Sequence, residues 1–134
     1  MLVITSKSPY AVRALAELAR RGGTAPVPIG EIARARDIPP QFLEGLFATL
    51  RRAGLLQSQR GVKGGYSFVQ DPSDVTVLKV VQLLEGEFDA EAAAAGSAVW
   101  PKAVGALRDA LSGTSIADVV QQEDQASGAP MYHI

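Results

Sequence analysis

Apolar residues recur with helical spacing in three segments of the first half of the chain. The first segment ends at Gly22-Gly23, the second is short and begins near Pro28, and the third ends at Gly54. Because a proline pushes the residue before it out of the helical region, the run Ile38-Pro39-Pro40 separates the second segment from the third. We expect Ser8 to be the N-cap of the first helix. The positions expected to face the core are Tyr10, Ala11, Ala14, Leu15, Leu18, Ala19, Ile29, Ile32, Ala33, Phe42, Leu43, Leu46, Phe47 and Leu50.

A hairpin is predicted directly after the third helix. Two strand-like runs, at 55–59 and 66–69, flank the glycine-rich tip Arg60-Gly61-Val62-Lys63-Gly64-Gly65. Thr76 is then expected to cap a further helix, because its hydroxyl can accept a hydrogen bond from the first helical turn. Residues 87–98 are alanine-rich and of low complexity, and this pattern does not distinguish a loop from a helix.

The last third of the chain contains a narrow apolar seam with a repeat close to 3.5 residues, which is typical of helices that pack on one another. Ser112-Gly113 ends this segment. Ser115 and Asp118 then have the spacing of a capping box, which predicts a short final helix, and the polar residues 123–134 predict a flexible tail. The seam consists of Trp100, Ala103, Val104, Leu107 and Leu111.

Together these elements predict a mainly α fold with a small β-hairpin wing. Two helices joined by a tight turn and followed by a basic hairpin are typical of a winged helix-turn-helix. We divide the chain into a winged helix-turn-helix region at 1–72, a helix and linker at 73–98, a long helix with a short final helix at 99–122, and the tail at 123–134.

Composition narrows the class of protein. The 134 residues are 47% hydrophobic and 20% charged, which is enough apolar surface for one folded domain. Cysteine is absent, which excludes disulfides, thiolate metal sites and a cysteine nucleophile. The opening sequence lacks the apolar region of a signal peptide, and no apolar run approaches the length of a membrane span, so we expect a soluble cytoplasmic protein.

Charge is distributed unevenly along the chain. Residues 1–70 carry ten basic and four acidic side chains, a net charge of +6, whereas residues 71–134 carry three basic and ten acidic ones, a net charge of −7. A basic half suggests that this part of the protein meets a polyanion. An uneven solvated surface is the alternative.

The third helix and the hairpin carry polar groups suited to double-stranded DNA. A helix fits the major groove, where Gln41 and Glu44 could reach base edges, and a cationic hairpin tip such as Arg60 suits the minor groove beside it. Gly45 lies on the same helix face, where glycine costs about 0.5–1 kcal/mol relative to alanine and therefore needs a reason. Alternatively, the helix dipole favours cations near a C-terminus, and turn geometry alone can require the hairpin glycines. The candidate DNA-binding residues are Lys7, Gln41, Glu44, Arg51, Arg52, Arg60, Lys63 and Gly64.

Five stretches make the sequence similar to a known family. They are Thr5-Ser6-Lys7, Tyr10-Ala11-Val12-Arg13-Ala14-Leu15, Phe42-Leu43-Glu44, Leu50-Arg51-Arg52-Ala53-Gly54-Leu55 and Arg60-Gly61-Val62-Lys63-Gly64-Gly65-Tyr66. They resemble the Rrf-two family of bacterial transcription regulators. The resemblance implies a homodimeric winged-helix repressor or activator whose recognition helix and wing face DNA with Gln41, Glu44, Arg51 and Arg60. It also implies a dimerisation helix, whose interface residues here would be Trp100, Val104, Leu107 and Leu111.

The sequence departs from this family at one place that bears on cofactors. Many members hold an iron–sulfur cluster through three cysteines between the fourth helix and the dimerisation helix. This chain has Glu87–Ala98 there, without a cysteine, and Ser97 stands where a histidine would precede the tryptophan. Because cluster ligation needs thiolates, we expect no cluster, no metal and no other cofactor.

The last four residues, Met131-Tyr132-His133-Ile134, suggest how a signal could reach a protein without a cluster. They resemble the C-terminus of the cluster-free cysteine-metabolism repressors of the family, which pair with O-acetylserine sulfhydrylase (CysK). The carboxylate of Ile134 could mimic the α-carboxylate of an amino-acid substrate in that enzyme. The alternative is a frayed end without function.

Two other functions remain open at this point. One is a DNA-binding regulator with a small-molecule pocket near Trp100, and the other is an adaptor that binds the enzyme without binding DNA. An enzyme is not expected, because His133 is the single histidine and the sequence offers neither a catalytic set nor a metal-ligand cluster.

Overall fold

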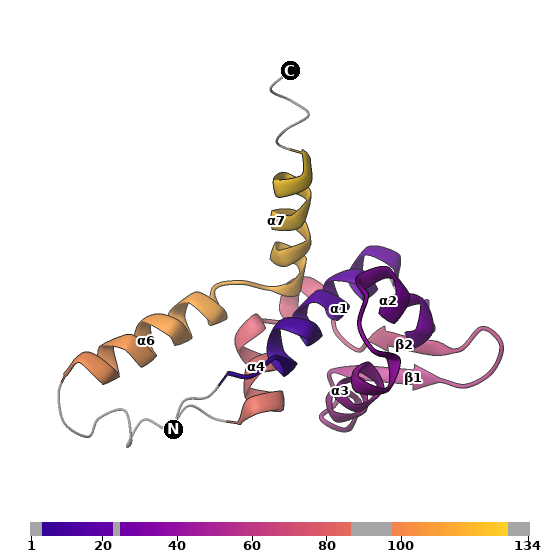
Figure 1. Ribbon diagram of the computed structural model, residues 1–134, viewed down its shortest axis with the longest axis horizontal. Helices are drawn as coiled ribbons and strands as arrows, with labels where there is room; N and C mark the ends of the chain where they lie inside the picture. Colours follow the sequence, from indigo (N-terminus) through magenta and orange to yellow (C-terminus); the bar gives the residue numbers. More distant parts are fainter. Residues whose placement is uncertain (1–3, 23–24, 87–97, 129–134) are drawn as a thin grey trace.

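The computed structural model describes residues 4–22, 25–86 and 98–128. These residues contain six α-helices and one two-stranded hairpin (Figure 1). The predicted mainly α fold with a β-hairpin wing is confirmed. None of the described helices is long and apolar enough to cross a bilayer. In chain order the elements are α1 (Lys7–Gly22), α2 (Ile29–Arg36), α3 (Pro40–Arg52), β1 (Leu56–Gln59), β2 (Gly65–Phe68), the 3₁₀ turn η1 (Pro72–Asp74), α4 (Val77–Glu85), α6 (Val99–Ser112) and α7 (Ile116–Gly128).

The core forms around α1, which packs against α2, α3, α4 and α7. Ala14 and Leu15 of α1 are completely buried, as are Leu43, Phe47 and Leu50 of α3. These residues have the 3–4-residue spacing seen in the sequence, so each helix turns one apolar stripe toward the others. Burial of these stripes is what holds α3 in place with its other face outward.

The turn between α2 and α3 brings these helices together as a helix-turn-helix. Asp37 adopts the left-handed conformation, with φ 53°, and its backbone N–H bonds to carbonyls at the end of α2. The Ile38 N–H donates to the Ala33 carbonyl at 2.9 Å, and the Ile38 side chain is buried. Pro39 and Pro40 then start α3, where a missing N–H costs nothing. The predicted boundary at the two prolines is therefore confirmed.

The hairpin is tied to the rest of the fold through Tyr66. β1 and β2 pair antiparallel, and Val27 forms an isolated bridge with Tyr66 through hydrogen bonds of 2.8 and 2.9 Å. The Tyr66 ring also packs edge-to-face on Phe47, with 5.3 Å between ring centroids. Because Phe47 belongs to α3, the orientation of the wing is coupled to that of α3.

The start of α1 differs from the sequence prediction. Ser8 is not the N-cap: it lies inside α1, is buried, and its hydroxyl donates to Glu85 Oε2 at 2.9 Å. The Lys7 N–H instead bonds to the Thr5 hydroxyl, while the Thr5 N–H bonds to Glu85 at 2.8 Å. A carboxylate from α4 thus meets the positive end of α1, an arrangement that local sequence cannot reveal.

Helices α6 and α7 leave the core in different directions (Figure 1). Thr76 caps α4, as expected, and also forms an isolated bridge with Ser115. Ser115 and Asp118 bond reciprocally at 2.9 and 3.0 Å, which confirms the capping box. The final helix, however, is not short. It continues to Gly128, so the expected boundary at 122 is wrong.

Ion pairs explain why α7 continues. Arg36 at the end of α2 donates two hydrogen bonds to Glu123, at 2.8 and 2.9 Å, and a third to Glu17 at 2.9 Å. Arg20 bonds to Glu123 at 3.1 Å and to Asp124 at 2.7 Å. These contacts hold the second half of α7 against α1 and α2. We call the group the charged cluster; it comprises Glu17, Arg20, Arg21, Glu31, Arg36, Glu123 and Asp124.

The charged cluster should make stability depend on pH in the acid range. Hydrogen bonds from Arg36, opposed by burial and helped by Arg20, hold the pKa of Glu123 below its usual value of 4.5. Burial would raise the pKa of Glu17, but hydrogen bonds from Arg21 and Arg36 outweigh it and lower this pKa as well. A lowered pKa in the folded protein stabilises it above pH 4.5, and this contribution disappears as the pH falls through the lowered value.

We therefore expect Glu123→Gln to lower the free energy of unfolding by about 1–2 kcal/mol at pH 7, because hydrogen-bonded charge pairs that are only partly exposed are worth about that much. Urea unfolding should show this difference shrinking below pH 4.5. Asp124→Asn is the matched control, because Asp124 is more exposed and makes one ion pair; it should cost less. An equal cost at pH 3 and pH 7 would contradict the assignment.

Candidate nucleic-acid interface

The outward face of α3 carries four of the predicted residues. Gln41, Glu44, Arg51 and Arg52 are all exposed, because the spacing that buries Leu43, Phe47 and Leu50 places them on the opposite side. Arg51 makes no ion pair or side-chain hydrogen bond with any described residue. Arg52 donates to the Thr49 hydroxyl at 3.2 Å, a neutral partner that leaves its charge uncompensated.

The wing tip presents two further cations. Arg60 and Lys63 are exposed, and neither is paired within the part of the chain that the structure describes. Gly64 is different: it is buried, and a Cβ there would overlap the carbonyl of Gln59. Gly65, with φ 149°, lies equally close to the carbonyl of Val27. The glycines are thus explained by the geometry of the hairpin, and the structure gives Gly64 no exposed group that could contact DNA.

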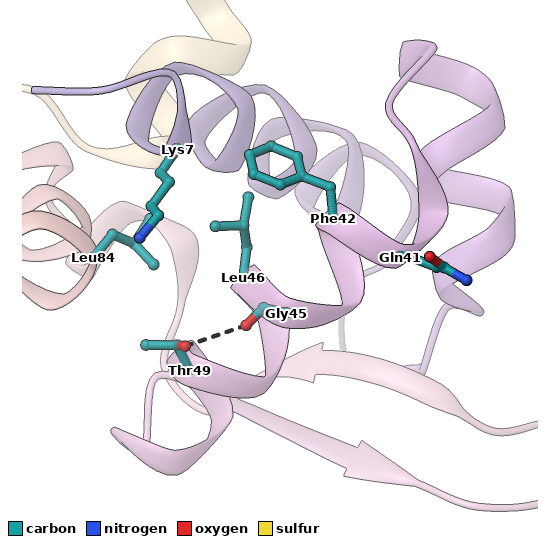
Figure 2. Close-up of a pocket in the computed structure, with 7 residues that line it drawn as sticks. All are labelled: Lys7, Gln41, Phe42, Gly45, Leu46, Thr49 and Leu84. Atoms are coloured by element: carbon teal, nitrogen blue, oxygen red, sulfur yellow. Dashed lines mark hydrogen bonds between the residues drawn. The ribbon is translucent and has the colours of Figure 1, made fainter.

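Lys7 joins this surface from α1. Together with Gln41 and Gly45 it lines an open hollow of about 350 Å³ between α1, α3 and α4 (Figure 2). Lys7 is exposed and makes no side-chain contact with a charged described residue. The first turn of α1 therefore places a cation beside α3, the helix that the family resemblance implies is the recognition helix.

Three of the five remaining arginines of the first half are compensated by acidic side chains of this chain. Arg20, Arg21 and Arg36 all belong to the charged cluster, where they bond to acids of α1, α2 and α7. Arg13 is different: it donates to the Arg36 carbonyl at 2.9 Å and lies over the Tyr10 ring, which are neutral groups that leave its charge uncompensated. Part of the basic excess of residues 1–70 is therefore neutralised by the acidic half, which the sequence analysis did not anticipate. The segregation of charge along the chain was the signal that could have indicated such pairing.

A group of uncompensated cations marks a surface suited to a polyanion. Its members lie on the outward face of α3, on the wing tip and at the start of α1, and Figure 1 shows α3 and the hairpin at the same end of the molecule. Unpaired cations can bind phosphates without first losing an internal ion pair. Sequence reasoning missed Val62 on this surface, a fully exposed apolar side chain (102%) between Arg60 and Lys63.

Helix α6 presents the predicted seam to solvent. None of its residues is buried, and Trp100 is 58% exposed. Val104, Leu107 and Leu111 are half-buried, and Leu111 also lines an apolar hollow with Val12, Val77 and Val81. An exposed apolar helix face of this kind usually packs on another protein surface. The predicted partner-binding residues Met131, Tyr132, His133 and Ile134 lie outside the described residues.

Comparison with known proteins places these features in a family. Residues 4–122 match the Rrf2 family, described as an iron-dependent transcriptional regulator. The regulator CymR of Bacillus subtilis is 29% identical over 98% of this chain and 99% of its own length. The regulator IscR of Photobacterium profundum is 39% identical over 65% of this chain and 51% of its own length.

Solved structures agree with this result. The structure of CymR, named the global cysteine regulator of B. subtilis, has a TM-score of 0.82 at 29% identity and covers 91% of this chain and 98% of its own. IscR of T. potens has a TM-score of 0.79 at 33% identity, over 93% of this chain and 90% of its own. Both are transcriptional regulators, which supports the expectation that this chain is not an enzyme.

The iron in the family description does not fit this sequence. The chain contains no cysteine and a single histidine, His133. Within the described ranges, no three His, Cys, Asp or Glu side chains are grouped so that they could hold a metal ion. An iron–sulfur cluster bound by thiolates is therefore excluded here.

Proposed function

The chain belongs to the Rrf2 family of transcriptional regulators, and on that premise we propose that it binds double-stranded DNA as a homodimeric repressor. The observation that carries the proposal is the partition of charge. Arginines beside α7 are paired with acids, whereas Lys7, Arg51 and Arg60 have no acidic partner among the described residues. In the proposal, α3 enters the major groove and the wing follows the adjacent minor groove.

Gln41 and Glu44 are proposed to read bases, because both are exposed near the start of α3. Glutamine can pair with adenine, and a carboxylate can accept a hydrogen bond from the cytosine amino group. Arg51, Arg52, Lys7 and Lys63 are proposed to bind phosphates, which position the protein without reading sequence.

The dimer is proposed to form through α6. Its exposed seam, centred on Trp100 and Leu107, would be covered by a second copy of this chain. A two-fold dimer places two copies of α3 on one side of the DNA, so the operator should be a pseudo-palindrome with half-sites about one helical turn, or a multiple of it, apart.

DNA binding is tested by titrating the purified protein against duplexes selected from a random pool. We expect affinity to fall steeply with salt, because each phosphate contact contributes a slope of about −0.9 to the plot of log K against log salt concentration. The selected sequences should be palindromic, and a scrambled duplex should bind more weakly. Absence of binding to any duplex at low ionic strength would contradict the proposal.

We further propose that the regulated genes serve cysteine or sulfur metabolism and that the signal arrives through O-acetylserine sulfhydrylase (CysK). Two observations support this: full-length similarity to a protein named as the global cysteine regulator of B. subtilis, and the absence of cysteines for a cluster. The residues proposed to enter the enzyme are Met131, Tyr132, His133 and Ile134, whose terminal carboxylate would occupy the position of a substrate carboxylate.

A further inference from the structure

Gly45 has no reason within the fold to be a glycine. It lies in the middle of α3, in ordinary helical conformation, and it is exposed. A Cβ added there would meet nothing within 4 Å beyond the helix itself. Gly64 and Gly65 are the contrast, because a Cβ at either would overlap backbone. Since glycine disfavours the middle of a helix relative to alanine, its presence at position 45 calls for a cause outside the monomer.

Gly45 opens onto the hollow between α3 and two neighbouring helices (Figure 2). Lys7 of α1 lies on one side, Leu84 of α4 lies beside it, and Phe42 and Leu46 supply apolar surface from α3. One turn further along α3, the Thr49 hydroxyl donates to the Gly45 carbonyl at 3.2 Å. The hollow thus combines apolar surface, one hydroxyl and one unpaired ammonium group.

We propose that Gly45 lacks a side chain so that the sugar–phosphate backbone of one DNA strand can seat in this hollow. The inference rests on the proposed DNA binding and specifies one part of it. A deoxyribose would lie against Phe42 and Leu46, and the adjoining phosphate would accept hydrogen bonds from the Lys7 ammonium group. A methyl group at position 45 would hold the strand away from α3 and lengthen the contact with Lys7.

The hollow suits the backbone of DNA rather than a base edge because of its position on α3. Gly45 and Thr49, four residues apart, lie on the side of α3 that faces α1 and α4, whereas the Gln41 side chain, at the edge of the hollow, points away from Lys7 (Figure 2). Glu44 belongs to the neighbouring, outward stripe and does not line the hollow. When a helix lies in the major groove, its outermost line meets the bases and its flanks meet the strands that wall the groove.

The test is Gly45→Ala, with Gly22→Ala as the matched control. Gly22 also belongs to a helix and also has open space around a Cβ, but it is the last residue of α1, fifteen residues from Lys7, and it belongs neither to α3 nor to α6. Gly45→Ala should melt at a slightly higher temperature than the wild type, and Gly22→Ala should melt no lower. Only Gly45→Ala should lose affinity, by about fivefold or more, and it should do so equally for a selected duplex and for a scrambled duplex of the same composition.

The salt dependence of DNA affinity distinguishes an effect of shape at position 45 from an effect of charge. Gly45→Ala removes no charge, so its slope should match that of the wild type, whereas Lys7→Gln should reduce the slope by about 0.9 for each phosphate that the variant no longer binds. Unchanged affinity of Gly45→Ala would overturn the inference. A loss of affinity confined to the selected duplex would also overturn it, because it would indicate a base contact. A lower melting temperature would overturn it as well, because it would indicate a structural role for Gly45. If the wild type binds no duplex, the proposed function itself fails.

Discussion

An Arg60→Ala protein should bind its operator about five to one hundred times more weakly than the wild type, as measured by fluorescence anisotropy at constant salt. Arg60 is exposed where the wing loop leaves β1, and it has no partner among the described residues. Removing an arginine that contacts DNA costs about 1–3 kcal/mol. The fold should be unaffected, because the exposed side chain makes no hydrogen bond or ion pair with a described residue, and the melting temperature should show this.

The matched control for Arg60→Ala is Arg21→Ala. Both variants lose one positive charge from the basic half of the chain, but Arg21 already bonds to Glu17 at 2.6 Å and lies 3.5 Å from Glu31. Its charge is compensated, so its loss should change DNA affinity little. Equal losses for the two variants would show that total charge matters and that the wing tip does not.

The position of Arg60 on the duplex can be resolved with the same variant. A side chain inserted in the minor groove benefits from the narrow groove of A·T-rich tracts, whose negative potential is enhanced. The loss caused by Arg60→Ala should then be larger on operators with A·T-rich flanks than on G·C-rich ones. Lys63→Ala, proposed to contact phosphate, should weaken both alike. Equal losses for Arg60→Ala on the two flanks would assign it to the phosphates instead.

Deletion of residues 131–134 should abolish binding to O-acetylserine sulfhydrylase, as measured by pull-down with the purified enzyme. The proposed contact is the α-carboxylate of Ile134, and the deletion removes it together with the side chain that would fill the substrate pocket. DNA binding and the melting temperature should stay unchanged. The charged cluster explains why: its last member is Asp124, so none of the ion pairs that hold α7 is lost.

A smaller change tests the same contact more sharply. One glycine added after Ile134 retains all four side chains but moves the carboxylate away from the isoleucine, and it should weaken enzyme binding nearly as much as the deletion. Met131→Ala serves as the control and should retain most of the binding. Unchanged capture of the enzyme by the deleted protein would reject the proposed role of the tail without affecting the proposal for DNA.

Much of the fold follows from local patterns. The apolar spacing places Leu43, Phe47 and Leu50 on one face of α3 wherever that helix packs, because 3.6 residues complete a turn. Pro39 and Pro40 separate α2 from α3, and the Ser115–Asp118 pair starts α7, since each acts on the backbone beside it. Ser8 shows the limit of this reasoning. Its hydroxyl donates a hydrogen bond to Glu85, which is 77 residues away, so local capping rules predict the wrong position for Ser8.

For the candidate site, too, some features follow from the sequence and others depend on the tertiary structure. The sequence alone shows that α3 and the wing carry cations and that a cluster held by thiolates is impossible, because both depend on which residues are present. It does not show which arginines are free. Arg36 and Arg60 are equally basic in the sequence, yet Arg36 is 14% exposed and bound to two carboxylates.

Only the tertiary structure could decide that difference, because the packing of α7 on α1 brings the carboxylate of Glu123 to Arg36, across 87 positions of the chain. The same holds for the glycines. Residue type identifies Gly45 and Gly64 as unusual positions, but the surrounding backbone shows that Gly64 is required by the hairpin and that Gly45 faces open space. Local geometry is determined by covalent neighbours, whereas charge compensation and free space depend on residues that become neighbours when the chain folds.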